Sequence, residues 1–308
     1  MAYTPQYADE TQSVRLRWRS NVIPVSISSS FLKQNLNIKA DSDVEGALRR
    51  SLEAWENVAD IKFQEVFTEK QTISPAGKAG DGVSLITIAQ TSENLLLFAG
   101  DASEIAARTR IFFNRRGVIT EADIVLNPYA QFSTDGTIGT FDLEATLTHE
   151  IGHLLGLEHS TVVASTMFAS QSKNGVYSLP NFSSRTLAED DKAGIRALYG
   201  CDSSDEDCGG GISGKLTAPP KKGLGNYEVF AEDVESGRTI ASVSVDAEGN
   251  FRFEGLNAGK YRLFAKSALK KSVSVEEIGE VEVEKNKTAS LNHKLEFKQT
   301  NFAVQFIG

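Results

Sequence analysis

Three of the four histidines in this chain fall within eleven residues, in the segment His149-Glu150-Ile151-Gly152-His153-Leu154-Leu155-Gly156-Leu157-Glu158-His159. On a helix, residues four apart share a face, so His149 and His153 can bind one metal ion. Glu150 lies beside that face and can reach a water at an open metal position. Gly156 tolerates left-handed backbone angles, so the chain can turn there and bring His159 back as a third ligand. The pattern predicts one catalytic zinc ion held by His149, His153 and His159, with Glu150 as general base. An ordinary core helix with surface histidines would explain the leucines of this segment but not its histidines.

Helices with clear start and stop signals must position these side chains. Asp142 is a suitable N-cap for the helix that carries the first two histidines, and Gly156 marks its end. A second helix is predicted from Val44 to Val58 by apolar residues spaced three and four apart. A third runs from Leu187 to Tyr199, where Thr186 and Glu189 form a capping box and Gly200 ends the helix.

The remaining patterned segments of the first region are predicted to be strands. Apolar alternation predicts strands at 14–18, 22–27, 61–66, 83–89, 105–113 and 122–126.

The segment CDSSDEDCGGG at 201–211 is polar and rich in glycine, as expected for a linker. Beyond it, short strands are predicted at 212–216, 227–232, 240–245, 250–254, 261–265, 281–284 and 290–297, a spacing typical of a β-sandwich. We therefore predict a zinc-site domain at 1–200, a linker at 201–211 and a sandwich at 212–308. Few apolar residues lie in the linker, so we expect little shared core and independent folding of the two parts.

Around the zinc motif, the first region resembles the metzincins, and among them the matrixins, which have catalytic domains like those of the matrix metalloproteinases. Ser160 follows His159, and Ser165-Thr166-Met167-Phe168 fits the Met-turn of that clan. The closing helix, with Asp190-Asp191 and Leu198-Tyr199-Gly200, is similar to the last matrixin helix. The resemblance spans about residues 13–200. It implies an α+β fold, a twisted mixed sheet with three main helices.

The same resemblance assigns roles to the turn and its supports. Met167 is expected beneath the zinc as a hydrophobic base rather than a ligand, and one of the two aspartates is expected to brace this turn. Two solvated helix residues are the alternative for the pair. No histidine precedes His149, so a second zinc site built from histidines is not expected, and no cysteine precedes Cys201 to act as a switch.

The second region resembles the carboxypeptidase regulatory-like, transthyretin-like sandwich. The residues that carry this likeness lie at 212–216, 227–229 and 246–261, where Phe251 and Phe253 share one strand face. Such a domain says little about function. His293 is in phase with Leu291 and Leu295, so we interpret it as a sandwich residue and not as a ligand.

These features predict a zinc-dependent endopeptidase. A zinc-bound water activated by Glu150 would attack the peptide carbonyl of an extended protein or peptide substrate. The resemblance implies that substrate pairs with an edge strand, for which 106–112 is our candidate, and that residues 168–182 wall the specificity pocket. The alternative is a secreted binding or adhesion protein with a vestigial metal site that works through the sandwich. The retained Glu150 argues against it.

Bulk composition excludes several partners. The net charge of −9 and the pI near 5.1 give no electrostatic basis for binding nucleic acid or anionic membranes, and no apolar stretch reaches the length of a membrane span. The first residues, MAYTPQYADE, lack the apolar run of a secretory leader, as a mature chain would, and we expect a secreted or cell-surface protein, favouring a monomer. Cys201 and Cys208 form either a small disulfide loop or two free thiols. Calcium sites near Asp101, Asp123 or Asp135 are considered, but no calcium ligand is assigned.

Overall fold

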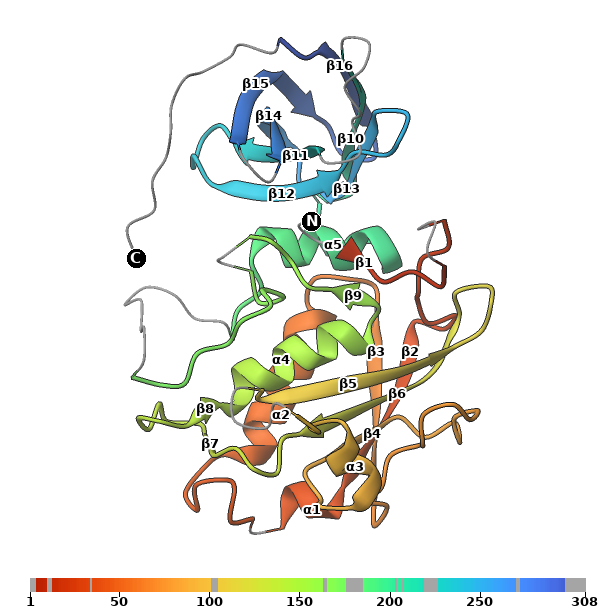
Figure 1. Cartoon of the computed structure of the whole chain (residues 1–308), viewed down its shortest axis with the longest axis vertical. Coiled ribbons are helices and arrows are strands. Elements are labelled where there is room, and N and C mark those ends of the chain that lie inside the picture. The colour runs from red at the N-terminus through yellow and green to blue at the C-terminus, as the bar shows by residue number, and fades with distance from the viewer. Residues whose placement is uncertain are drawn as a thin grey trace.

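The computed structural model describes residues 4–9, 13–33, 35–100, 105–162, 165–175, 185–202, 204–206, 208–218, 227–269 and 272–296. The described part contains no helix with the length and apolar character needed to cross a membrane. Figure 1 shows two bodies, one holding the mixed sheet and the zinc-motif helix and the other built from strands, with one helix between them.

A five-stranded mixed sheet forms the frame of the first region, in the order β3-β2-β4-β6-β5. Four strands run parallel and the fifth, at one edge, is antiparallel to its neighbour. The strands are β2 (Val22–Ser28), β3 (Lys62–Thr68), β4 (Leu85–Thr87), β6 (Ile119–Leu126) and the edge strand β5 (Ala107–Phe113). Strands β4 and β6 are buried along almost their whole length, as expected where both faces of a sheet are covered, whereas β2 alternates between buried and more exposed residues.

Two long helices pack together against this sheet. They are α2 (Val44–Glu56) and α4 (Leu143–Leu154), and the indole of Trp55 donates to the carbonyl of Thr148 across their contact at 3.0 Å. The predicted cap of α4 is confirmed, because Asp142 accepts a hydrogen bond from the amide of Ala145 at 3.0 Å. Two short helices, α1 (Ser29–Leu32) and α3 (Ser92–Leu96), lie at the far end of the sheet.

The closing helix α5 (Glu189–Tyr199) begins two residues later than its predicted start at Leu187. The predicted capping box of Thr186 and Glu189 is wrong. Instead the carboxylate of Asp191 accepts the amide of Ala188 at 2.9 Å, which sets the start of the helix there.

The predicted strand at 14–18 is also wrong. Arg15 and Arg17 make only isolated bridges, to Tyr7 and Val118. The amide of Leu16 donates to the carbonyl of Gln6 and that of Arg17 to the carbonyl of Gly117. The amide of Trp18 donates to the hydroxyl of Tyr199 at 3.0 Å, so successive residues bond to different partners and no continuous ladder forms. Four two-residue strands complete the region: β1 (Thr4–Pro5) with β9 (Leu157–Glu158), and β7 (Phe132–Ser133) with β8 (Phe141–Asp142).

The second region is a sandwich of two sheets around its own core. One sheet has the order β13-β10-β16 and the other β12-β11-β14-β15. The strands are β10 (Gly210–Thr217), β11 (Tyr227–Asp233), β12 (Thr239–Ser244), β13 (Asn250–Leu256), β14 (Gly259–Leu269), β15 (Ser272–Val283) and β16 (Thr288–Lys294). Strand β15 is much longer than the predicted 281–284, because it pairs with β14 along that whole strand.

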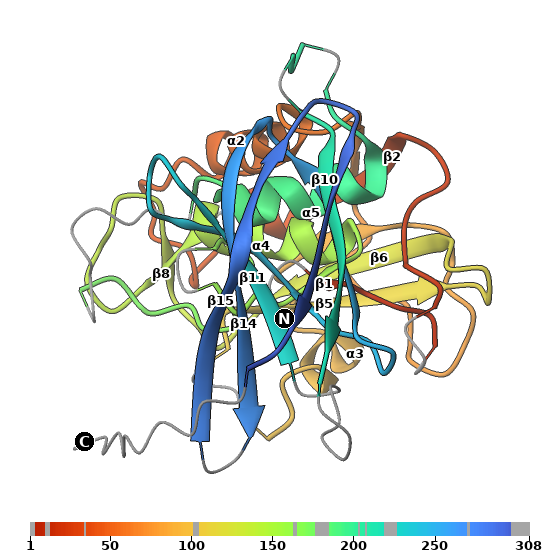
Figure 2. The ribbon, with the colours of Figure 1, turned by 90° about the horizontal axis from the view of Figure 1, so that it is seen from above.

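The two regions meet at the 201–208 disulfide loop and at helix α5. Cys201 and Cys208 are joined by a disulfide, so of the two alternatives the small disulfide loop is confirmed and the two free thiols are not. Each region has its own hydrophobic cluster, and the part they share is small: Ala193 of α5 is buried within the cluster of the sandwich, and Ala197 packs against it. Independent folding of the two parts stays a prediction. Seen from above in Figure 2, the strands of the sandwich lie over α5. The apolar contact between the two regions therefore lies on this helix.

Candidate metal centre

The three histidines of the motif converge at the end of α4. His149 and His153 lie one turn apart on the helix, and Gly156, at a φ of +97°, turns the chain so that His159 faces them. The Nε2 atom of His153 lies 3.1 Å from Nε2 of His149 and 3.2 Å from Nε2 of His159. Among the described residues, these three form the group of histidine, cysteine or acidic side chains that could hold a metal ion.

Hydrogen bonds to backbone carbonyls orient two of the rings. Nδ1 of His149 lies 2.7 Å from the carbonyl oxygen of Thr166, and Nδ1 of His153 lies 2.8 Å from that of Leu157. A carbonyl can only accept, so Nδ1 must carry the proton in both rings and Nε2 is left with a free lone pair. The lone pairs therefore belong to the nitrogens that converge.

This donor set fits zinc. Two nitrogens bound to zinc at 2.0–2.1 Å in tetrahedral geometry lie about 3.4 Å apart, close to the spacing seen here. Burial and the neighbouring imidazoles lower the pKa of His153 and of His159, which keeps both rings neutral near pH 7. Neutral imidazole is the form that binds a metal.

Glu150 lies next to this cluster with its carboxylate held from the edge strand. The hydroxyl of Thr109 on β5 donates to Oε2 of Glu150 at 2.6 Å. Burial raises the pKa of the Glu150 carboxyl above its ordinary value, while His149 and the Thr109 hydrogen bond lower it. Thr109 was not identified from the sequence, because it lies 41 residues away and belongs to no motif.

The segment 165–168 forms the expected turn beneath the histidines. Met167 is almost fully buried and packs against α4 so closely that a Cβ at Gly152 would lie 2.2 Å from its sulfur. The amide of Ser160 donates to the carbonyl of Met167 at 2.8 Å, which ties the turn to the residue after His159. Met167 thus lies beneath the histidines as a buried apolar residue, the position that the family resemblance implied.

Both aspartates at the start of α5 hold this part of the chain, so neither is merely solvated. Asp191 accepts the amides of Thr166 and Met167 at 2.7 and 3.0 Å and also the hydroxyl of Ser165. Asp190 accepts the hydroxyl of Ser160 at 2.6 Å. Asp191 is therefore the brace that the resemblance implied.

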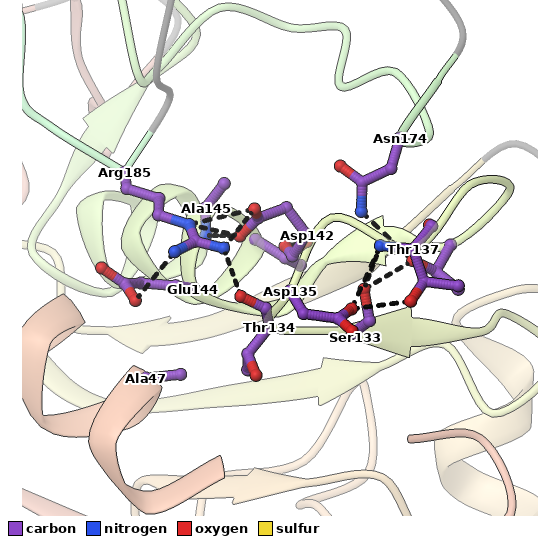
Figure 3. Close-up of polar contacts among 12 residues, drawn as sticks. Ala47, Ser133, Thr134, Asp135, Thr137, Asp142, Glu144, Ala145, Asn174 and Arg185 are labelled. Carbon is purple, nitrogen blue, oxygen red and sulfur yellow. Dashed lines mark hydrogen bonds and ion pairs between the residues drawn. The ribbon is translucent and has the colours of Figure 1, made fainter. Parts of the chain in front are cut away.

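A second polar network fixes the other end of α4 (Figure 3). Arg185 donates through Nε and Nη2 to the Asp142 carboxylate at 2.7–3.1 Å and through Nη2 to the carbonyl of Thr134 at 2.8 Å. The next acid along α4, Glu144, accepts from Nε of Arg50 on α2 at 2.8 Å. The N-cap that starts the zinc helix is thus paired with a residue that lies beyond the Met-turn.

Residues after Met167 run back along α4 toward this network. The hydroxyl of Thr146 donates to Oε1 of Gln171 at 2.9 Å, and Asn174 exchanges backbone hydrogen bonds with Gly139 and Thr140 at 2.8 Å. The predicted pocket wall at 168–182 is described only as far as Gly175, and residues 176–182 lie outside the described residues.

Two of the three aspartates near which calcium sites were considered are engaged by other groups of the protein. Asp123 is buried and accepts the amides of Ser74 and Leu85, both at 3.0 Å. Asp135 pairs with Lys39, and Asp101 lies outside the described residues. His293 is hydrogen-bonded to Glu276 at 2.8 Å, which confirms its prediction as a sandwich residue.

Comparison with known proteins agrees with this architecture. The matrixin family model matches residues 17–200, and the carboxypeptidase regulatory-like domain model matches residues 211–296. Similar proteins include a hatching enzyme of Paracentrotus lividus, 30% identical over 198 residues, which are 61% of this chain and 27% of that protein. Metalloendoproteinase 1-MMP of Arabidopsis thaliana is 28% identical over 191 residues, 60% of this chain and 44% of that protein. Human matrix metalloproteinase-19 is 34% identical over 161 residues, 50% of this chain and 25% of that protein.

The chain thus spans less than half the length of each of these relatives. The family model nevertheless covers more than half of the chain, including all three histidines, Glu150 and Met167. The chain belongs to the matrixin family.

Proposed function

We propose that this chain is a zinc-dependent endopeptidase in which His149, His153 and His159 hold one zinc ion and Glu150 is the general base. The observation that carries the proposal is the convergence of three imidazole nitrogens: Nε2 of His153 lies 3.1 Å from Nε2 of His149 and 3.2 Å from Nε2 of His159. A buried carboxylate, that of Glu150, lies beside them. The metalloendoproteinases among its relatives support the same reading.

Zinc, when bound, supplies Lewis acidity: it polarises a carbonyl oxygen and makes water more acidic. Glu150 accepts the proton of the attacking water and returns it to the leaving amine. Its raised pKa makes it a stronger base than an exposed glutamate, and the Thr109 hydroxyl keeps the carboxylate oriented toward the cluster. The imidazole protons donated to Thr166 and Leu157 keep the rings fixed during these steps.

The substrate is expected to be an extended peptide that pairs with β5. This strand lies at the edge of the sheet, and Thr109 on it contacts the base, so a chain aligned along β5 passes the metal centre. Because Cys201 and Cys208 are disulfide-bonded, we further propose that the protein works in an oxidising compartment, secreted or at the cell surface.

The test is Glu150→Gln, which keeps the size of this buried side chain and an oxygen for Thr109. Zinc content should match the parent chain, while hydrolysis of a peptide library should fall by about 10²–10⁴-fold. Glu53→Gln, at an exposed position on α2, is the matched control and should leave hydrolysis unchanged. A zinc-loaded parent chain that cleaves no peptide in the library would favour the alternative of a binding protein.

A further inference from the structure

Helix α5 connects the metal centre to the sandwich. Its first turn carries Asp191, which holds the amides of Thr166 and Met167 under the histidines. Its later residues face the other domain: Ala193 is buried in the sandwich core, and Ala197 packs against the same cluster. A displacement of α5 would therefore move both the turn under the histidines and the contact with the sandwich core.

The backbones of the two regions approach each other closely at Gly255 on β13. Gly255 has a φ of +70°, and a Cβ added there would lie 2.5 Å from the carbonyl oxygen of Ala193 and 3.1 Å from the amide nitrogen of Ala197. These are backbone atoms of a helix and cannot swing away as a flexible side chain would. The backbone of the sandwich thus rests directly on the backbone of α5.

Polar contacts across the boundary fix the same position. Arg196 of α5 is mostly buried and donates to Oδ1 of Asn257 in the sandwich at 2.9 Å and to the carbonyl of Val58 at 3.1 Å. Arg15 in the first region donates to Glu254 on β13 at 2.6 Å. One guanidinium therefore links the sandwich, α5 and the end of α2.

We propose that the sandwich is a positioning element of the metal centre, acting through the contact of Gly255 with α5. Strand β13 holds α5 in place, Asp191 on α5 holds the turn at 165–167, and the Thr166 carbonyl of that turn orients His149. The inference deepens the proposed function, since the ion at this site is taken to be zinc. It makes Gly255 a positioning residue that touches neither the ion nor the substrate.

The test compares two glycines that both have a positive φ in the full chain. Gly255→Ala places a methyl group against α5, whereas Gly237→Ala, at a φ of +64°, places one where no atom lies within 4 Å. Both variants place a side chain at a positive φ, and only Gly255→Ala also places it against the backbone of α5. We expect about a tenfold rise in the zinc dissociation constant for Gly255→Ala, as seen when outer supports of metal ligands are changed, and no change for Gly237→Ala.

Hydrogen exchange gives a readout that needs neither zinc nor activity. The amides of Thr166 and Met167 donate hydrogen bonds to Asp191. Their hydrogens should exchange with solvent faster in Gly255→Ala than in the parent chain. Asn257→Ala, which removes one acceptor of Arg196, should shift both measurements in the same direction and serves if Gly255→Ala does not fold.

Parent-like zinc affinity and exchange in the folded variants would overturn the inference, as would equal losses in the two glycine variants. A parent chain that binds no zinc would overturn the proposed function instead, while faster exchange at 165–168 would still support the role of the sandwich.

Discussion

Asp191→Asn should destabilise the first region strongly although it changes only one atom of the side chain. Asp191 is fully buried and accepts four hydrogen bonds. Oδ1 accepts the Ser165 hydroxyl and the Met167 amide, and Oδ2 accepts the amides of Thr166 and Ala188. All four partners are donors, so only an acceptor at both positions satisfies them.

Asparagine keeps one oxygen and places an NH₂ group where the second oxygen was. Two hydrogen bonds are lost, and two donors are left facing another donor. At about 1–3 kcal/mol for each unsatisfied buried group, the loss is about 2–6 kcal/mol. Burial raises the pKa of Asp191, so removing its charge relieves some desolvation, and we expect a net loss of about 2–4 kcal/mol in the free energy of unfolding. That is a large share of the 5–15 kcal/mol typical of a folded domain.

Urea unfolding of the metal-free protein, with EDTA present, measures this quantity without a contribution from zinc binding. Asp60→Asn is the control, because Asp60 is exposed, and its change should stay within about 0.5 kcal/mol. If Asp191→Asn unfolds at the same urea concentration as Asp60→Asn, then the four hydrogen bonds do not brace the turn as argued.

Three further changes test other parts of the structure. His153→Ala removes the imidazole that lies close to both His149 and His159, so metal analysis should find that stoichiometric zinc is lost. The control His293→Ala, in the sandwich, should retain zinc. Burial raises the pKa of Asp123 to about 7, with the nearby charge of Glu121 adding to the shift. The native state therefore keeps a proton on Asp123 that the unfolded chain releases above about pH 4. As a result, the free energy of unfolding falls as pH rises from about 4 to 7. Glu121→Gln should weaken this fall, seen as a smaller drop in Tm between pH 5 and pH 8 than in the parent chain, both metal-free; an unchanged drop would contradict it. Arg185→Gln should cost about 1–2 kcal/mol and alter the peptide cleavage profile, because it frees the segment after the Met-turn from α4. Arg50→Gln, which pairs with α4 but not with that segment, should leave the profile intact, and equal changes in both variants would refute the assignment.

Local sequence signals were sufficient where the structure depends on neighbours along the chain. The spacing of His149 and His153, the cap at Asp142 and the turn at Gly156 are all set within one helix and its end. The same holds for the sandwich strands that lie between clear turn residues, whose predicted positions largely match β10 to β14.

Contacts between distant residues could not be predicted in this way. Thr109 reaches Glu150 only because β5 lies beside α4 in the folded sheet. The segment at 14–18 alternates as a strand should, yet the hydroxyl of Tyr199 takes the amide of Trp18 and no ladder forms. The contact of Gly255 with α5 leaves no pattern in the sequence, since glycine there resembles any turn glycine.

The pairing of the sandwich strands sets the order in which the protein can be completed during synthesis. Strand β10, the first of the sandwich, lies between β13 and the last described strand, β16, with which it runs parallel from Gly211 to Thr217. The sheet that covers α5 therefore cannot close until residues near Lys294 have left the ribosome. About 95 residues separate the end of α5 from the end of β16, which takes about 5–20 s at typical elongation rates. During that interval Ala193 and Ala197, on a helix that already belongs to the first domain, lack the completed sandwich core that buries them. A nascent chain stalled before β16 should therefore be more sensitive to protease at α5 than one released after it.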